Sequence, residues 1–269
     1  MSQRETPACG HVGPSAARDA LVALRNLEHL AKSPKVGHKI MADLLPELSV
    51  GLGTLDGYFR AHVDEGGAGE TGLLAFAALG RVREAVESMD SRMGAGARLK
   101  LERALGEDVP RLEGCVEVCE LWLRASAPLE TELDVKDAFF ATFAPCGGEA
   151  SGAVWVRIPE RPLPFVGDSA VLSWVLRALA VEGAPRVAFG ADESEDAVLT
   201  IRRRAVESPP AGALAMRPRG AVPKVAHREA IQRIVERSGF SLRLEPDEAV
   251  LTLAPRRRAD RRSAVPALE

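Results

Sequence analysis

The sequence predicts an α+β protein, with an N-terminal antiparallel helical bundle followed by a mixed α/β part. Apolar residues recur with a helical period up to about residue 127, and strand-like alternation begins after Pro128. The chain has 269 residues, 46% hydrophobic and 27% charged, which is ordinary for a folded protein of one or two domains. We therefore expect a disordered leader at 1–14, a helical bundle at 15–127, an α/β domain at 128–255 and a basic flexible tail at 256–269.

Four amphipathic segments with short breaks predict the bundle. They cover about residues 16–32, 34–63, 71–93 and 97–125. Ser33-Pro34 is a favourable N-cap and first-turn pair, so we place the start of the second helix there. Pro110 lies inside the fourth segment and predicts a kink or a break.

The remaining segments predict the α/β part. In order they are a first strand at 129–133, a short helix capped by Asp134, a strand through Val154, Val156 and Ile158, a helix at 169–181, a hairpin around 190–196, an irregular loop at 207–224 and a last helix ending at Gly239 before two strands. Strands that alternate with helices in this way are typical of a layered α/β domain.

Composition and spacing argue against several functions. Cys115 and Cys119 share one face of a predicted helix, and we expect both to be core residues and no metal site to be present. No run approaches the roughly 18 apolar residues of a membrane span, and the N-terminus lacks the apolar core of a secretion signal, so we expect a cytoplasmic protein without a membrane partner. The basic runs 202–204 and 256–262 lack interleaved aromatic residues. They favour a solvated surface or an acidic partner surface over nucleic acid.

The stretch from 167 to 183, GDSAVLSWVLRALAVEG, resembles the N-box helix of bacterial sensor histidine kinases. In that family the helix reads roughly D-x-x-x-L-x-x-V-L-x-N-L-x-x-N-A, and Asp168 stands at its first position here. ELDVKDAF and, at 230–244, AIQRIVERSGFSLRL are similar to the family's segments before and after this helix. The resemblance covers about 129–255 and implies an α/β sandwich of the histidine-kinase ATPase (Bergerat) type.

The same resemblance implies that the ATP chemistry has been lost. Ala178 and Glu182 occupy the positions of the two N-box asparagines, the second of which coordinates the nucleotide-bound magnesium in the family. After the strand near 197–203 there is no Asp-x-Gly, and no glycine-rich segment precedes the last helix, although backbone without side chains is needed to cradle phosphates. We expect a pseudokinase without a nucleotide cofactor that acts in a two-component system through protein–protein interaction.

A histidine phosphotransferase of a phosphorelay is the alternative. His29, Ser33 and Pro34 match the offsets of the family's phospho-acceptor box, with Leu30 in place of the acidic residue. His29 points away from the apolar face of its helix, and Arg25 and Lys32, one turn to either side, could favour a phosphoryl group. The expected partner is a response-regulator receiver domain or another signalling protein, with a homodimer through the bundle as a further possibility.

Two other hypotheses remain open at this stage. Counting back from the first strand, as the family spacing suggests, places the acceptor box near 86–92, which contains no histidine. The four segments could then form, within one chain, the bundle that kinases build by dimerising. A divergent but active ATPase or kinase is the other hypothesis.

Overall fold

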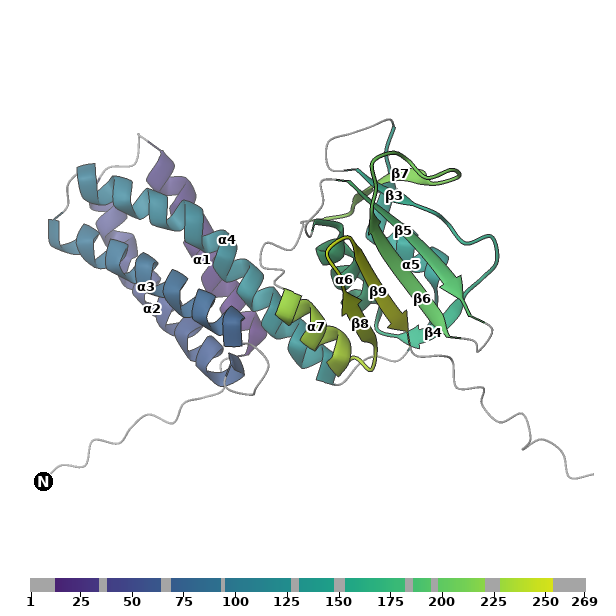
Figure 1. Ribbon diagram of the computed structural model, residues 1–269. Helices are drawn as coiled ribbons and strands as arrows, with labels where there is room; N and C mark the ends of the chain where they lie inside the picture. The colour runs from purple at the N-terminus through teal and green to yellow at the C-terminus, as the bar shows by residue number, and fades with distance from the viewer. Residues whose placement is uncertain are drawn as a thin grey trace, which may run out of the picture. The chain divides into compact units, whose positions relative to one another are not determined.

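The computed structural model describes residues 13–33, 38–63, 69–92, 95–126, 131–147, 153–181, 186–194, 198–220 and 228–253 (Figure 1). They belong to two compact units, one of Met1–Leu123 with Pro223–Arg233 and the other of Arg124–Val222 with Ile234–Glu269. The first contains a helical region and the second a mixed sheet with helices, so the predicted α+β class is confirmed. The expected leader and basic tail lie almost wholly outside the described residues.

The first unit is a closed antiparallel bundle of α1 (Pro14–Lys32), α2 (His38–Val63), α3 (Gly69–Arg92) and α4 (Ala95–Ser126). Ion pairs fix the direction of α4 against α1, because Arg18 pairs with Glu120 and Arg25 with Glu113, so the numbers rise on one helix as they fall on the other. α2 packs against α1 and α3, and Arg81 of α3 pairs with Asp108 of α4, which completes the ring.

A single apolar core runs through this bundle. Leu24, Leu55 and Leu105, from α1, α2 and α4, are all fully buried, as are Cys115 and the neighbouring apolar residues of the same cluster. The expectation of buried core cysteines is confirmed, since Cys119 is also buried and neither is in a disulfide. This core is formed by residues of all four helices.

The structure bears on two predicted details of the bundle, the kink or break at Pro110 and the role of Ser33. α4 continues through Pro110 without a break, because the flanking Val109 and Leu112 are fully buried and tertiary packing outweighs the lost backbone hydrogen bond. Ser33 is the C-cap of α1, where its backbone N–H donates to the Leu30 carbonyl oxygen at 3.1 Å. α2 is described from His38, and the intervening 34–37 lie outside the described residues.

The described part of the second unit contains a seven-stranded mixed sheet in the order β2-β7-β3-β5-β6-β9-β8 and a two-stranded sheet of β1 and β4. The strands are β1 (Thr131–Asp134), β2 (Phe143–Pro145), β3 (Val154–Val156), β4 (Pro164–Gly167), β5 (Val187–Glu193), β6 (Leu199–Ala205), β7 (Leu214–Pro218), β8 (Ser241–Leu244) and β9 (Glu248–Leu253). Its helices are α5 (Val135–Thr142) and α6 (Ser169–Val181), and α7 (Arg228–Arg237) is divided between the two units after Arg233. β3 and β5 are parallel, and the other pairs are antiparallel.

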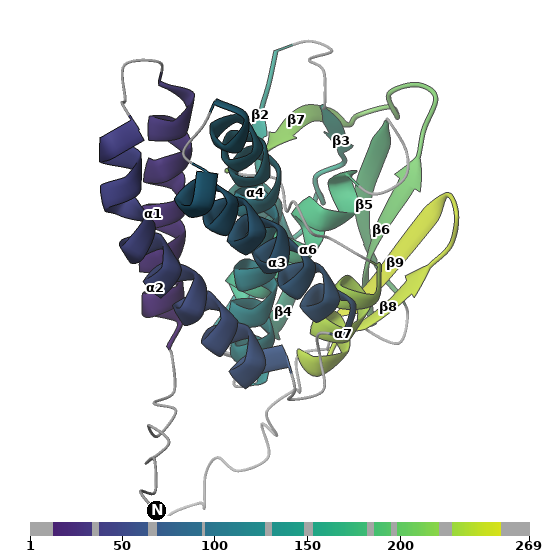
Figure 2. The ribbon, with the colours of Figure 1, turned by 90° about the vertical axis from the view of Figure 1, so that its left-hand side faces the viewer.

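The two faces of this sheet differ in chemistry. Along β5 and β6, Val187, Phe189, Leu199 and Ile201 are buried, while the alternate residues are polar or small and partly exposed. α6 lies against one face in both ribbon views (Figures 1 and 2). The alternation therefore separates a helix-covered apolar face from an uncovered polar face.

The predicted strands and helices of this unit are largely found, with two corrections. The stretch 207–224, expected to be an irregular loop, contains β7, which pairs with β2 on one side and β3 on the other. The predicted hairpin is found, with residues 190–193 in β5 and paired antiparallel with β6. The first strand begins at Thr131 and includes Asp134, whose side chain caps α5 as expected, accepting from the Lys136 backbone N–H at 2.8 Å.

Candidate functional site

His29 lies on the solvent face of α1 and is exposed, as its position on the helical wheel predicts. Asn26 and Val22, one and two turns before it, are also exposed and share this face. Glycine at 13 begins the helix and Pro14 is its first residue, a combination that fixes the N-terminal turn without a side-chain cap. The surface of α1 around His29 is therefore open to a partner protein.

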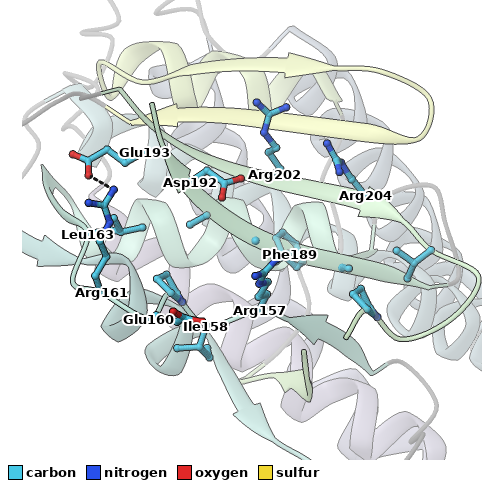
Figure 3. Close-up of a pocket in the computed structure, with 16 residues that line it drawn as sticks. Arg157, Ile158, Glu160, Arg161, Leu163, Phe189, Asp192, Glu193, Arg202 and Arg204 are labelled. Atoms are coloured by element: carbon cyan, nitrogen blue, oxygen red, sulfur yellow. Dashed lines mark ion pairs between the residues drawn. The ribbon is translucent and has the colours of Figure 1, made fainter. Parts of the chain in front are cut away.

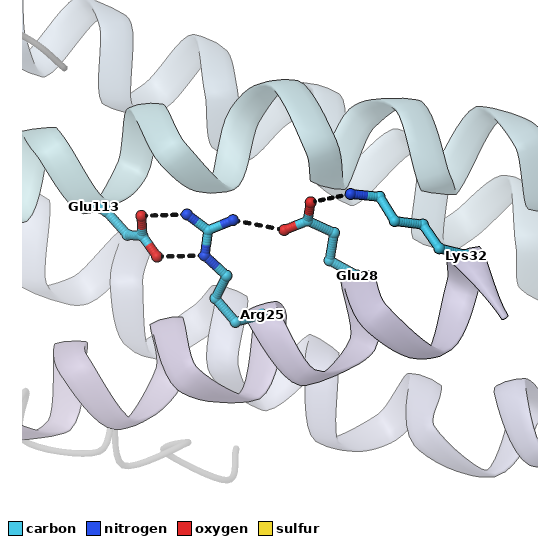
Figure 4. Close-up of polar contacts among 4 residues, drawn as sticks. All are labelled: Arg25, Glu28, Lys32 and Glu113. Carbon is cyan, nitrogen blue, oxygen red and sulfur yellow. Dashed lines mark hydrogen bonds and ion pairs between the residues drawn. The ribbon is translucent and has the colours of Figure 1, made fainter. Parts of the chain in front are cut away.

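The two cations predicted to support His29 are held in a chain of ion pairs (Figure 4). Arg25 donates from Nε and Nη2 to the two carboxylate oxygens of Glu113 on α4, both at 2.6 Å. It also donates from Nη1 to Glu28 Oε2 at 2.8 Å, and Lys32 Nζ donates to Glu28 Oε1 at 2.6 Å. Glu28 is thus clamped between a cation one turn before it and a cation one turn after it.

Burial and hydrogen bonding shift the pKa of Glu28 in opposite directions. Only 4% of its surface is exposed, and this burial raises the pKa of the carboxyl group. The hydrogen bonds from Lys32 and Arg25 outweigh burial, so the pKa lies below its ordinary value and Glu28 is ionised at neutral pH. Arg25 and Lys32 are consequently paired with carboxylates before any phosphoryl group arrives.

Glu28 and Glu113 are the site residues that sequence reasoning missed. Glu28 could have been found from the sequence, because it stands three residues after Arg25 and four before Lys32, the spacing of helical ion pairs. Glu113 comes from another helix, and no local pattern indicates it. Ser33, the remaining predicted residue, accepts a hydrogen bond on its carbonyl oxygen from Arg98 of α4 and ends the helix that carries His29.

The predicted N-box residues lie on and before α6. Asp168 caps this helix: its Oδ1 accepts from the backbone N–H groups of Ala170 at 2.9 Å and Val171 at 3.3 Å. Its Oδ2 accepts from Arg124 Nε at 2.7 Å, and its side chain is 1% exposed. Burial raises the pKa of Asp168, but the Arg124 and backbone hydrogen bonds outweigh it and bring the pKa below the ordinary value.

Ala178 is fully buried on the apolar side of α6, where Trp174 and Val175 are also buried. A methyl group at this position packs in the core and offers no ligand to a metal or a nucleotide. Glu182, the other replaced position, lies outside the described residues. Asp168 and Ala178 are therefore brought onto one helix, while His29 and its neighbours form a separate cluster on α1.

The sequence contains no Asp-x-Gly motif after the strand near 197–203, and this strand is β6. β6 continues through Ala205, and Val206 then donates its backbone N–H to the Arg186 carbonyl oxygen at 3.1 Å. Within β6, Arg203 is 4% exposed and lies on the same face as the buried Ile201. β6 is thus a strand with one buried arginine.

No known protein family matches the chain, and no curated protein is significantly similar to it. Within the described residues, no helix is long and apolar enough to cross a membrane. The same residues contain no group of three or more His, Cys, Asp or Glu side chains placed to hold a metal ion.

Proposed function

We propose that this chain is a two-component signalling protein of degenerate histidine-kinase architecture, with a domain of the Bergerat type that no longer binds ATP. One observation carries the proposal: Ala178, at a position where the resembled family has an asparagine, is fully buried in an apolar environment. The Asp168 cap that opens the helix is retained, so the helix keeps its structure while its ligand-binding position has become part of the core.

In this role the protein works by binding other proteins, and the helical bundle supplies the surface. A closed bundle with its own core presents the exposed face of α1 without requiring a second copy of the chain. The expected partner is a response-regulator receiver domain, which this protein would bind and sequester.

Two measurements on the full chain test this function. Calorimetric titration with Mg-ATP should give no binding heat at millimolar nucleotide, and a panel of purified receiver domains should contain at least one that co-elutes with the protein. The co-elution should weaken when Val22 and Asn26 are both replaced by Glu, because two charges then occupy the exposed face of α1. Saturable binding of Mg-ATP would refute the proposal.

The exposure of His29 favours a second function, phosphotransfer between receiver domains. A neutral imidazole nitrogen of His29 would attack the phosphorus of a receiver's aspartyl phosphate. The new P–N bond forms as the acyl phosphate P–O bond breaks, and the aspartate leaves as a carboxylate. Transfer to a second receiver is the same step in reverse, so no ATP is consumed.

Incubation with a radiolabelled phosphorylated receiver separates the two functions. Under phosphotransfer, label moves to the wild-type chain in an acid-labile form and does not move to a His29→Gln variant. Asn26→Gln is the matched control, since it alters an equally exposed residue one turn away that is not a nucleophile. A wild-type chain that binds the receiver without taking up label supports the pure binding function.

A further inference from the structure

A groove of about 960 Å³ lies on the uncovered face of the seven-stranded sheet (Figure 3). Its floor is formed by the small residues Ala188, Gly190 and Ala191 of β5. Apolar side chains border it at Ile158 and Pro159 after β3, and at Val206 and Pro210 after β6. This groove belongs entirely to the second unit and includes neither His29 nor Asp168 and Ala178.

Strand register places two arginines on either side of a glycine at one end of this groove. Gly190 of β5 is directly opposite Arg202 of β6. On the other side, Val156 of β3 pairs with Phe189, so Arg157, the next residue, lies beside Gly190 and donates its N–H to the Phe189 carbonyl oxygen at 2.9 Å. With neighbouring strands about 4.8 Å apart, the two arginine backbones are about 10 Å apart with no side chain between them.

Positive charge exceeds negative charge at this end. Arg204, two residues along β6, donates from Nε to Glu248 Oε1 at 2.8 Å, and Arg202 pairs with the same oxygen at 3.6 Å. No ion pair of Arg157 is found among the described residues, and its side chain is exposed. Two guanidinium groups therefore share one carboxylate, and that of Arg157 adds a third positive charge. We name Arg157, Arg202 and Arg204 around Gly190 the arginine cradle.

The other end of the groove is acidic. Glu193 pairs with Arg161 at 3.0 Å, while Asp192 and Glu160 add two further carboxylates that have no ion pair in the described part of the chain. Figure 3 shows Glu193 and Arg161 away from the arginine cradle, with Asp192 lying between them and Arg202. From Ala188 to Glu193 the strand advances about 17 Å, the length of an extended segment of five or six residues.

We propose that this groove binds an extended segment of a partner protein. The bound segment carries carboxylates at the end that meets the arginine cradle and none at its other end. Guanidinium forks match carboxylates in bidentate geometry, and the bare Gly190 floor lets the bound main chain approach the sheet. The apolar borders accept intervening side chains. A uniformly charged polyanion such as a nucleic acid fits less well, because the acidic end repels it. His29 and the bundle take no part in this binding.

The direct test is fluorescence anisotropy of the full chain with a labelled octapeptide carrying three glutamates at one end and two lysines at the other. Arg157→Gln and Arg202→Gln should each weaken binding at least about tenfold, which corresponds to about 1.4 kcal/mol. Gly190→Leu should weaken binding similarly without changing any charge, because the new side chain occupies the cradle. The chain should tolerate this change, since a Cβ at Gly190 meets nothing within 4 Å. Arg217→Gln, on β7 and outside the groove, is the matched control and should bind like the wild type.

Several results would overturn the proposal. If Gly190→Leu binds like the wild type, or if Arg217→Gln loses as much affinity as Arg157→Gln, the attraction is diffuse charge without a groove. Tighter binding of an eight-nucleotide oligothymidylate than of the peptide would assign the site to nucleic acid. No saturation by the peptide below about 1 mM would show that the groove does not take such a segment. A His29→Gln variant should bind the peptide normally, which keeps this test separate from that of the proposed function.

Discussion

Replacing Asp168 tests whether one buried carboxylate both starts α6 and anchors Arg124. In Asp168→Asn the amide oxygen can still accept from the Ala170 and Val171 backbone N–H groups, but an amide NH₂ replaces the oxygen that meets Arg124. In Asp168→Ala both functions are lost. Comparison of the two variants therefore separates the ion pair from the helix cap.

The magnitudes follow from these contacts. A hydrogen bond to a charged group contributes about 1.5–3 kcal/mol, and the lower part of that range applies because the Arg124 side chain is 42% exposed and can turn to water. An N-cap contributes about 1 kcal/mol. We expect Asp168→Asn to lower the free energy of unfolding by about 2 kcal/mol and Asp168→Ala by about 3 kcal/mol.

Urea unfolding followed by tryptophan fluorescence is the assay. A Trp122→Phe background leaves Trp155 and Trp174, both in the second unit, so the signal reports on the unit that contains Asp168. The pKa of Asp168 is lowered in the folded chain, so its contribution is complete above the unfolded value of about 3.9 and is lost as the pH falls through the folded value. The difference between wild type and Asp168→Asn should shrink in acid. A difference below about 0.5 kcal/mol at pH 7, or one that persists in acid, would refute the reasoning.

Three further predictions rest on burial. Gly167→Ala should destabilise the second unit by about 1–3 kcal/mol in the same assay, because its Cβ would lie 2.6 Å from Phe240 Cζ, and a change below about 0.5 kcal/mol would contradict this packing. Burial raises the pKa of Cys115 and Cys119 to about 12, so with the other two cysteines changed to Ser a thiol reagent should label neither in the native chain and both in urea. Tyr58 is the single tyrosine and is fully buried, and this burial raises its pKa. In an alkaline titration, absorbance near 295 nm should therefore show no phenolate before the chain unfolds. Titration of the phenol near pH 10 in the folded chain would contradict the burial.

Local signals in the sequence predicted what depends on local chemistry. α6 begins and ends where its pattern places it, and Asp134 caps α5. Gly239 has φ 78° after α7, the left-handed conformation that the Gly C-cap requires. These features need only a helical period and a residue with a special backbone or side-chain preference at its end.

β7 shows what local signals leave out. Its surroundings are rich in proline, glycine and alanine, so the composition favours a loop. The strand forms because Met216 is fully buried and because β2 and β3 provide hydrogen-bond partners on both sides. Those partners are distant along the chain, and nothing within 207–224 indicates them. The ion pair between Arg25 and Glu113 was missed for the same reason, since it joins two helices 88 residues apart.

The arginine run of β6 shows how a strand divides one sequence motif between two roles. Arg202–Arg204 do not share a face, because Arg203 is buried on the face of Ile201 while its two neighbours stand on the other face. Two arginines separated by one residue would have remained a solvated pair on the surface of a flat strand. They form a cradle because Gly190 leaves the adjoining position empty and Arg157 closes it from the other side. Charge on this face is therefore concentrated by the register of three strands. The basic run alone does not contain that register, so it predicted a solvated surface or an acidic partner and could not indicate where a partner would bind.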